Sequence, residues 1–570
     1  MIPRFNSSPT TTAVGQNMSA DASQAATTDT DSTRADLPDA KRQVIAEAAN
    51  EFVFGVVGHI GSGTSEVARF FKELLERQKN PFQTKILKAT DVIEAWSKSA
   101  GLSFPDRNAP RSIASAQRWQ DLGDEMRRET KDHAAVAKGL ISEIRVVRGA
   151  ACNKPVIDGQ PVMPDGKSRA YILDALRHPA EVNLLRHLYE EAFVLIAVVC
   201  DQDVREIRLG RKLGSPELSK LHEFMKRDEK DNRIHGQQVA RSFQLADFYV
   251  DNTSDRFTYT ETGEKLEENP EWDINGKLGR LVHIVTYDGI ERPEISETAM
   301  HHAYSAQMRS ACLSRQVGAA LVDRNGNLLA TGTNEVPKAG GGVYGERFPD
   351  DHKPKDNHDP KDDHTQILDQ RCAFRPDKYC SSTQEQNVII DSIIDDVSAI
   401  QTLSPDKKDT LRRQLKHGRV GDTIEFSRAV HAEMDALLSA ARSGASTIGT
   451  RLFVTTYPCH YCARHIISAG VDEVQYIEPY FKSLASRLHS DAIQQRLVGW
   501  QPPSENGRTV LFRPFTGVAP RLYRRAFIKD RDLKDEDTGI LKISPPDWGT
   551  PWHLRRKSYV QLEAQITKAD

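Results

Sequence analysis

The chain has 570 residues, of which 38% are hydrophobic and 28% charged, a composition typical of a globular protein with two or three domains. Its formal net charge is −3, so the chain lacks the excess of basic residues that would favour a polynucleotide partner. Seven cysteines in a chain of this length do not make a disulfide framework and favour a cytoplasmic setting, and no apolar run is long enough to predict a membrane span.

The first 45 residues are rich in serine, threonine, alanine and aspartate, and they contain few large apolar side chains. Such a segment buries too little apolar surface to offset the entropy lost on ordering. We therefore predict a disordered tail over residues 1–45. The segment also lacks the apolar central region of a secretory signal.

A glycine-rich turn follows a short apolar strand that the sequence predicts at residues 52–57 (FVFGVV), and an amphipathic helix comes after the turn. Strand, glycine-rich turn and helix form the context in which backbone N–H groups bind phosphate. The turn matches G-x-x-x-x-G-K-[ST], except that Thr64 replaces the lysine. We predict that it binds a nucleotide with Mg²⁺ without efficient phosphotransfer, and a loop that no longer binds is the alternative. The candidate binding residues are Gly58, Gly61, Gly63, Thr64 and Ser65.

The region after this helix predicts the rest of a parallel sheet. The segment PVIDG (155–159) predicts a strand that ends at Asp158, and two further apolar runs predict buried strands at 193–200 and 246–252. A helix between the last two carries three arginines that either cover phosphates as a lid or form a solvated face: Arg205, Arg208 and Arg211. Residues 50–255 as a whole resemble deoxynucleoside monophosphate kinases, which implies a P-loop kinase-like domain in which the acid at 158 is linked to magnesium.

Residues 256–290 are polar and rich in turn-forming residues, so they predict a linker between two domains. Beyond them, the sequence predicts a helix over about 294–313. A hairpin is expected next, with strands at 317–322 and 328–331 joined through Asn325-Gly326, a dipeptide that favours tight turns.

The most specific pattern lies further along the chain, where HAE at 431–433 is followed by PCHYC at 458–462. An H-x-E triplet with a later P-C-x-x-C is the signature of zinc nucleobase deaminases. One imidazole and two thiolates would hold one Zn²⁺ per chain and leave a fourth position for a water that the metal acidifies. We predict Glu433 as the catalytic acid–base residue and three metal ligands: His431, Cys459 and Cys462. A structural zinc site is the alternative, although such a site usually has four protein ligands.

Local patterns around this motif predict how its side chains are brought together. Residues 431–443 and 459–469 predict helices that end at glycines, and the apolar, β-branched run 451–456 predicts a strand. All three ligands would then lie at helix N-termini, where the helix dipole favours a thiolate.

Several segments within residues 291–495 resemble the deoxycytidylate deaminase family: SRQVGAALV, GTNEVP, HAEMDALL, TTYPCHYCARHIISAGVDEVQYIEPY and FKSLA. The resemblance implies a cytidine-deaminase-like domain with a mixed sheet between two helical layers, and hence an α/β chain with two such domains. It also implies that Asn334 contacts the sugar or base of a nucleotide. Arg315 and Lys482 are candidates for phosphate contacts or are ordinary surface cations.

Taken with the kinase-like half, this domain resembles the anti-phage dCTP deaminases of bacteria. The resemblance implies zinc-dependent deamination of dCTP to dUTP, and also of dCMP to dUMP, which depletes dCTP during infection. It further implies a homo-oligomer and makes a regulatory RNA a candidate partner. The alternatives left open are a dCMP deaminase of pyrimidine salvage, a polynucleotide cytidine or adenosine deaminase, and a regulatory protein in which the zinc fold only scaffolds.

Two segments depart from the compact family pattern. Residues 337–425 form an insertion, and its first part predicts either a polar lid or a second metal site that would use His352, His358, His364, Cys372 and Cys380. Residues 496–570 predict a C-terminal extension, whose arginines and aromatic side chains would either bind single-stranded nucleic acid or pack against the body.

Overall fold

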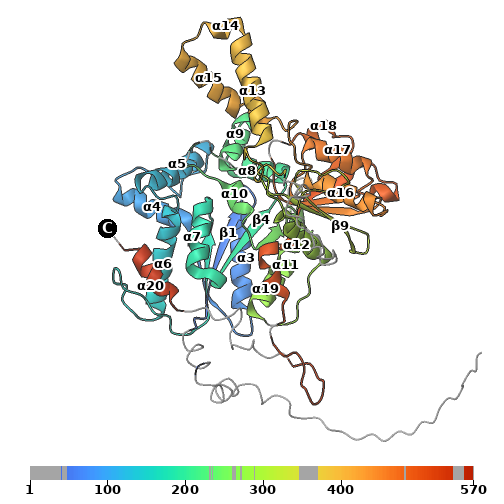
Figure 1. Ribbon diagram of the computed structural model, residues 1–570. Helices are drawn as coiled ribbons and strands as arrows, with labels where there is room; N and C mark the ends of the chain where they lie inside the picture. Colours follow the sequence, from blue (N-terminus) through green and yellow to red (C-terminus); the bar gives the residue numbers. More distant parts are fainter. Residues whose placement is uncertain are drawn as a thin grey trace, which may run out of the picture.

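The computed structural model describes residues 40, 48–229, 231, 233, 235–259, 265–269, 272–287, 289–345, 370–480, 483–529, 531–542 and 557–568. Within these residues the chain forms two six-stranded sheets flanked by helices, and one two-stranded sheet (Figure 1). One large sheet is parallel apart from an edge strand, and the other is mixed, so the predicted α/β class is confirmed. The tail predicted over residues 1–45 lies almost entirely outside the described residues.

The first sheet is built mainly from the N-terminal half of the chain. Four of its strands are apolar and buried along nearly their whole length, as expected when helices cover both faces of a parallel sheet. In spatial order the strands are β14 (Gly517–Val518), β5 (Phe248–Asp251), β4 (Phe193–Val199), β1 (Glu51–Gly58), β3 (Arg169–Asp174) and β2 (Gln83–Lys88).

Helices cover this sheet on both faces, and three more lie beyond the carboxyl ends of its strands (Figure 1). One face carries α3 (Thr64–Glu76), α11 (Ile274–Thr286) and α19 (Pro520–Phe527). The other face carries α4 (Ala89–Ser99), α5 (Ile113–Glu129), α6 (Ala135–Ala151), α7 (Pro179–Tyr189) and α20 (Tyr559–Ile566). The helices beyond the strand ends are α8 (Gln202–Lys212), α9 (Leu218–Glu229) and α10 (Val239–Phe243).

The segment predicted as a linker contains regular structure. It includes the two-stranded sheet, β6 (Phe257–Tyr259) with β7 (Lys265–Glu268), and it includes α11. Five apolar side chains of α11, at helical spacing, are buried in the core beside α3: Ile274, Leu278, Leu281, Val282 and Val285. Much of this stretch is therefore part of the first half of the molecule.

The second sheet contains the hairpin and the strand that the sequence predicted between the metal-binding motifs. Its order is β12 (Ile493–Gln494), β13 (Val510–Pro514), β11 (Glu473–Glu478), β10 (Arg451–Thr456), β8 (Gly318–Val322) and β9 (Leu328–Thr333). The helix α12 (Ile295–Gln307) packs on one face. The other face carries α16 (Ala432–Arg442) and α17 (His460–Ser468), with α18 (Ala485–Leu488) beside α17.

Two glycines allow helices to approach the hairpin closely from its two faces. A Cβ at Gly318 would lie 2.0 Å from the backbone oxygen of Ala303 in α12, and a Cβ at Gly332 would lie 2.1 Å from that of Ala432 in α16. Any side chain at position 332 would therefore push the start of α16 away from the sheet. This contact fixes the helix start, which carries the HAE motif.

The C-terminal segment links the two sheets. Residues expected as an extension supply β13 to the second sheet and, after Pro514, β14 to the first. The buried core is also continuous, because residues such as Met300 of α12 and Phe453 of β10 belong to the same cluster as the apolar face of the first sheet. The predicted domain boundaries stay predictions, but the two halves share one core.

The described part of the aromatic and basic C-terminal stretch packs against the body. Leu522 is buried, Arg525 donates to the carbonyl oxygen of Glu191 at 2.9 Å, and Arg531 donates to that of Tyr287 at 3.0 Å. The second aromatic and basic run lies mostly within residues 543–556, outside the described residues. Binding of RNA by this stretch stays a prediction.

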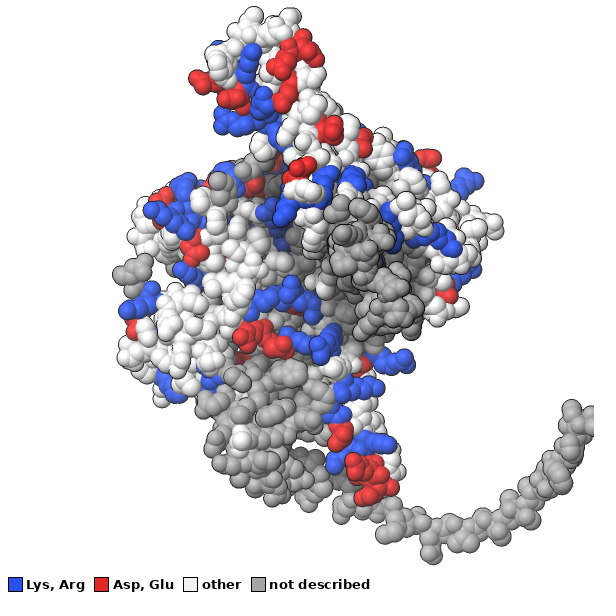
Figure 2. Space-filling view, in the orientation of Figure 1, with Lys and Arg blue, Asp and Glu red and all other residues white. Residues whose placement is uncertain are grey.

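The insertion forms a helical hairpin that projects from the body (Figure 1). Its helices are α13 (Ser381–Asp396), α14 (Ser398–Gln401) and α15 (Pro405–His417). Acidic side chains of α13 and basic side chains of α15 lie close together on this projection, which therefore carries both signs of charge (Figure 2). Across the described part of the chain, no helix has the length and apolar character needed to cross a membrane.

Candidate active site

The predicted metal ligands meet at the N-termini of two helices. His431 is the N-cap of α16, Cys459 is the N-cap of α17, and Cys462 lies in the first turn of α17. Nδ1 of His431 is 3.4 Å from Sγ of Cys459 and 3.3 Å from Sγ of Cys462. The three donor atoms lie within 4.8 Å of one another, and no other three His, Cys, Asp or Glu side chains among the described residues meet in this way.

This donor set fits zinc. A tetrahedral Zn²⁺ with bonds of about 2.0–2.3 Å separates its donor atoms by roughly 3.5 Å, close to the observed spacing, and it accepts one imidazole and two thiolates. The hydrogen bond with Cys462 lowers the pKa of the Cys459 thiol to about 4, whereas burial raises the pKa of the Cys462 thiol well above its usual value. A bound dication would favour the thiolate at both positions.

Glu433 lies beside the cluster in the first turn of α16, and only 4% of its surface is exposed. Burial, and then the negative charge of Cys459, raise the pKa of the Glu433 carboxyl to about 7. A dication bound at the cluster would lower this pKa, because a nearby opposite charge favours the ionised carboxylate. Glu433 is thus a buried carboxyl beside the metal ligands but outside the ligand set.

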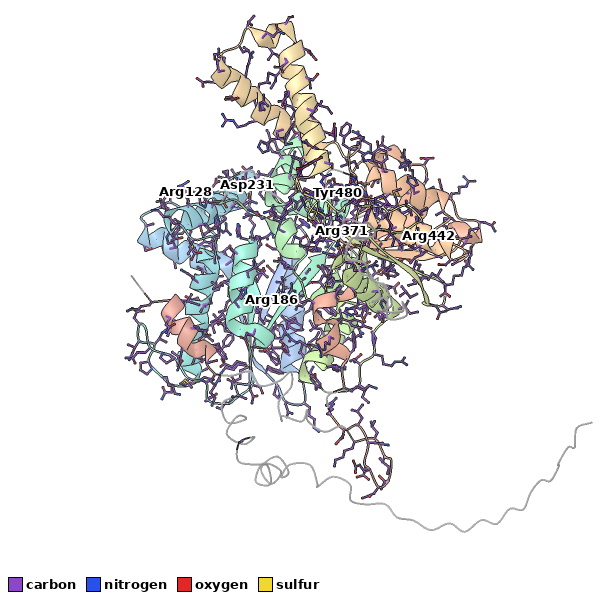
Figure 3. The ribbon with its side chains drawn as sticks, in the orientation of Figure 1. Arg128, Arg186, Asp231, Arg371, Arg442 and Tyr480 are labelled. Atoms are coloured by element: carbon purple, nitrogen blue, oxygen red, sulfur yellow. The ribbon has the colours of Figure 1, made fainter. Side chains whose placement is uncertain are left out.

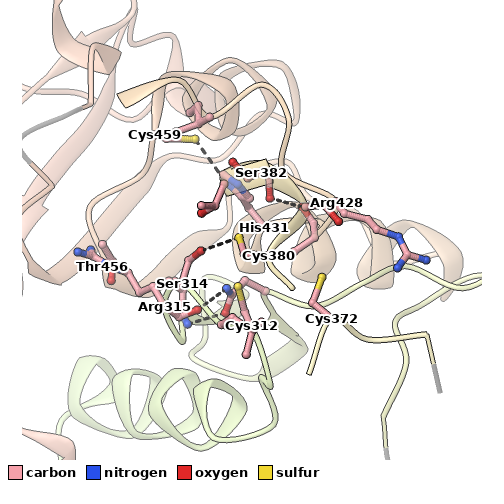
Figure 4. A pocket seen from close by; sticks show the side chains of 18 of the residues that line it. Cys312, Ser314, Arg315, Cys372, Cys380, Ser382, Arg428, His431, Thr456 and Cys459 are labelled. Carbon is pink, nitrogen blue, oxygen red and sulfur yellow. Dashed lines mark hydrogen bonds between the residues drawn. The ribbon is translucent and has the colours of Figure 1, made fainter. Parts of the chain in front are cut away.

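A cavity of about 390 Å³ opens in front of this cluster. His431, Glu433 and Cys459 line it on one side, and the segment 312–317 lines another (Figure 4). The insertion adds to the wall through the start of α13 and through residues 421–424, and the segment 427–429 and the ends of β10 and β11 complete it. Figure 4 shows Ser382 of α13, its N-cap Cys380 and Arg428 around the same cavity as His431 and Cys459.

The three residues predicted to contact substrate differ in what the structure shows. The side-chain amide of Asn334 makes two hydrogen bonds to the backbone. Its Oδ1 accepts from the Val317 N–H at 2.6 Å, and its Nδ2 donates to the Arg315 carbonyl at 2.7 Å. Asn334 lines the cavity and also holds the segment that carries Arg315. The Arg315 side chain lines the same cavity, whereas Lys482 lies outside the described residues. Their roles toward substrate stay predictions.

The second metal site predicted in the insertion also stays a prediction. Cys372 and Cys380 line the cavity, and Sγ of Cys380 is 3.4 Å from the Ser314 hydroxyl. Neither cysteine joins two other ligand side chains within the described part of the chain. The three histidines of that prediction, at positions 352, 358 and 364, lie outside the described residues.

The glycine-rich turn lies at the carboxyl end of β1, and α3 begins at Thr64. Gly61 and Gly63 have φ angles of 87° and 85°, a left-handed conformation that glycine adopts without strain. The Asn252 side chain donates to the Ser62 carbonyl at 2.8 Å and braces the turn. The Ile60 N–H donates to a carboxylate oxygen of Asp228 at 2.8 Å, so this N–H is already engaged.

The acid that faces this turn differs from the predicted one. Residues 155–159 form no strand: Val156 and Ile157 are 41% and 46% exposed, and Asp158 lies in a turn. The buried strand is β3, which ends at Asp174, and the Ser65 hydroxyl donates to Oδ2 of Asp174 at 2.6 Å. Asp174 therefore occupies the position that we had assigned to Asp158.

The helix α8, for which the sequence left open a lid over phosphates or a solvated face, packs against the turn. Arg205 is buried, and a Cβ at Gly61 would lie 3.0 Å from its carbonyl oxygen. Arg208 donates to the Asn252 carbonyl and pairs with Asp255. Lys212 at the end of α8 is exposed. The cation that contacts the turn is Arg177, which donates to the Gly58 carbonyl at 3.1 Å and pairs with Asp228.

Sequence reasoning missed the residues that reach the cavity from distant segments. These include Cys312, Gln386, Arg428, Thr456 and Tyr480. Thr456 and Tyr480 lie in a segment that resembles the deaminase family, but no local pattern marks any of the five as cavity residues, because tertiary contacts between distant segments bring them together. Asp174 had a signal, since RAYILD is an apolar strand pattern with a terminal acid.

Comparison with known proteins identifies a related region. Residues 293–478 match the family described as the cytidine and deoxycytidylate deaminase zinc-binding region. The deoxycytidylate deaminase of Enterobacteria phage T4 is 25% identical over 188 residues, 33% of this chain and 80% of that protein. ComE operon protein 2 of Bacillus subtilis (strain 168) is 44% identical over 54 residues, 10% of this chain and 29% of that protein.

Among solved structures, the dCMP deaminase of cyanophage S-TIM5 in complex with dCMP and dUMP is 21% identical. The match covers 40% of this chain and 99% of that chain, with a TM-score of 0.21. The matched family region contains the donor cluster, the buried glutamate and most of the cavity wall. Residues 293–478 are therefore similar to the zinc-binding region of the cytidine and deoxycytidylate deaminase family.

Proposed function

We propose that this protein deaminates deoxycytidine nucleotides at C4 of cytosine, by hydrolysis that depends on Zn²⁺. The observation that carries the proposal is a buried carboxyl, Glu433, beside a His/Cys/Cys donor set at the wall of a cavity. A metal-activated hydrolysis needs this combination of ligands and one acid–base group.

The roles of the residues follow from their chemistry. His431, Cys459 and Cys462 would hold the zinc ion, which when bound lowers the pKa of a water and so supplies the nucleophile. Glu433 accepts the proton of that water on its carboxylate and delivers it to the ring nitrogen of cytosine. When the oxygen of that water has bonded to C4, the same carboxylate takes the second proton from the new hydroxyl and passes it to the amino group, so that the C4–N bond breaks with release of ammonia. Glu433 is buried beside the cavity, where it can reach both groups.

We further propose dCTP as the main substrate, with dUTP as the product and depletion of dCTP as an anti-phage defence. The insertion supports this choice, because it adds a wall to the cavity through the start of α13. Arg315 also lines the cavity, and its guanidinium suits a phosphate group. The relatives named deoxycytidylate deaminase favour dCMP as the second candidate substrate.

Product analysis tests this proposal directly. Purified zinc-loaded protein is incubated separately with dCTP, dCMP, CTP and deoxycytidine, and the products and ammonia are measured. Conversion of dCTP to dUTP is the expected result. Deamination of dCMP alone would replace the defence proposal with a salvage enzyme, and absence of turnover on all four would contradict deamination of mononucleotides.

We also propose that the glycine-rich turn binds a nucleotide with Mg²⁺ and that the first half serves as a sensor or scaffold. The Ser65–Asp174 pair supports a magnesium position, and Arg177, which donates to the Gly58 carbonyl at 3.1 Å, supplies positive charge beside the turn that Thr64 lacks. The turn is also linked to the second half through α10. The rings of His59 in the turn and Phe243 in α10 are 5.5 Å apart, and the next residue is Gln244, whose amide, assigned with its nitrogen toward Glu478, donates to the second sheet.

A Ser65→Ala variant tests the magnesium position. Removing the hydroxyl should weaken binding of Mg²⁺-ATP or Mg²⁺-dTTP by about tenfold, because a ligand to a charged ion is lost. Isothermal titration with and without Mg²⁺ measures the change, and Ser219→Ala, at an exposed position in α9, is the matched control. Equal binding by the wild type and Ser65→Ala, or no binding by either, would contradict the proposed magnesium site.

A further inference from the structure

Glu478 lies at the junction of the two halves, at the end of β11. In the register of the second sheet it pairs with Thr456 of β10, and its carbonyl accepts from the Tyr457 N–H at 2.7 Å. Thr456 and Tyr457 both line the cavity in front of the metal ligands. The backbone at Glu478 is therefore fixed directly behind the cavity wall.

The carboxylate of Glu478 accepts from three side chains. Nη1 of Arg315 lies 3.2 Å from Oε1, and the Thr456 hydroxyl donates to Oε2 at 3.2 Å. The third donor is Gln244: with its amide assigned so that the nitrogen faces the carboxylate, as the two acceptors require, this nitrogen lies 2.9 Å from Oε1 and 3.1 Å from Oε2. Thr456 ends β10 of the second sheet and Arg315 lies in the loop before β8, whereas Gln244 follows α10 of the first half.

Arg315 is constrained on a second side. Its guanidinium lies over the ring of Tyr480, 5.5 Å from the ring centre, and Tyr480 also lines the cavity. Figure 3 shows Tyr480 between the two halves of the molecule. A long side chain that is 42% exposed would otherwise sample many rotamers, and the ion pair with Glu478 reduces this freedom.

We propose that Glu478 is a positioning residue for the deaminase site: it holds Arg315 at the cavity wall toward the phosphate of the nucleotide, and Gln244 of the first half holds Glu478. The first half thereby completes the substrate site of the second. This inference rests on the proposed deamination of deoxycytidine nucleotides. It adds a residue to that site and assigns a structural task to the kinase-like half.

The predicted consequence is a selective loss of substrate affinity. In Glu478→Gln, the KM for the nucleotide identified by product analysis should rise on the order of tenfold, because a charge-assisted contact that orders Arg315 is lost. The kcat should stay within about twofold, since Glu433 and the metal ligands are untouched. Glu505→Gln, which removes the carboxylate partner of Arg324 at an exposed position, should change neither value.

A double-mutant cycle separates positioning from a general structural effect. Arg315→Gln should raise KM at least as much as Glu478→Gln, and the double variant should be no worse than Arg315→Gln alone. Gln244→Ala should raise KM in the same direction and should have no further effect when combined with Glu478→Gln. Zinc content and thermal midpoint, measured for each variant, should match the wild type.

Three outcomes would overturn the proposal. The first is a lower kcat at unchanged KM, and the second is independent, additive losses from Arg315→Gln and Glu478→Gln. An unchanged KM in Gln244→Ala would refute the contribution of the first half. Failure of the wild-type protein to deaminate any nucleotide would instead refute the proposed function, so the two failures are distinguishable.

Discussion

Glu433→Gln will retain its zinc and lose most of its ammonia release. Glutamine fills the same buried space in the first turn of α16, but it cannot accept the proton of an activated water. Positioned acid–base groups contribute roughly 10²–10⁴-fold to a rate, and a loss of this size is expected in kcat. The measurements are a coupled ammonia assay and the metal content of the purified variant.

The result discriminates between two roles of this residue. If Glu433→Gln kept wild-type turnover, the carboxyl would not be the proton carrier and the proposed mechanism would be wrong. If the variant lost its zinc, the residue would instead maintain the metal site. Cys462→Ala supplies the comparison, because loss of a buried thiol from the donor set should remove metal and activity together.

The largest effect on stability is expected from Glu563→Ala, far from the cavity. Arg148 is fully buried, and its guanidinium bonds both carboxylate oxygens of Glu563, at 2.5 and 3.0 Å, and one of Glu51, at 2.7 Å. Removing one acid leaves a buried cation with half of its partners. Breaking a buried pair in this way costs about 3–5 kcal/mol. Urea unfolding of the two proteins measures the difference.

A matched control is available on the surface. Lys72 and Glu76 form an exposed pair one turn apart in α3, and Glu76→Ala should cost less than about 1 kcal/mol. Because Glu563 belongs to α20, its loss should also release that helix from α6 and α7 and expose it to proteases. A loss of stability in Glu563→Ala no larger than that in Glu76→Ala would show that α20 is not anchored by this network.

The sequence predicted elements whose signals are local. Hydrophobic runs and helix-capping residues correctly predicted the buried strands β1, β4 and β10 and the helices α16 and α17. The metal cluster could be predicted together with these elements, because its three donor residues lie at the N-termini of α16 and α17. The strand predicted at 155–159 was wrong, because two apolar residues after a proline match a strand pattern although their side chains are exposed.

Other features depend on contacts between distant segments. The helix α11 contains Gly276 and Gly279, which lower helix propensity, so packing against α3 decides its structure. Where the insertion borders the cavity, residues more than sixty positions apart in the sequence come into contact, such as Ser314 and Cys380. Periodicity and composition carry no information about such pairs.

The short segment from β13 to β14 has a consequence for the order in which the protein is assembled during synthesis. Phe515 N–H bonds Tyr476 in one sheet at 2.8 Å, and four residues later Ala519 N–H bonds Asp247 beside the other at 2.9 Å. Domains generally fold as units while the chain leaves the ribosome, N-terminal first. Here neither sheet has all its strands until residues 510–518 have emerged. Both halves therefore reach their final form together, late in translation, and neither can be completed by the chain that precedes this segment.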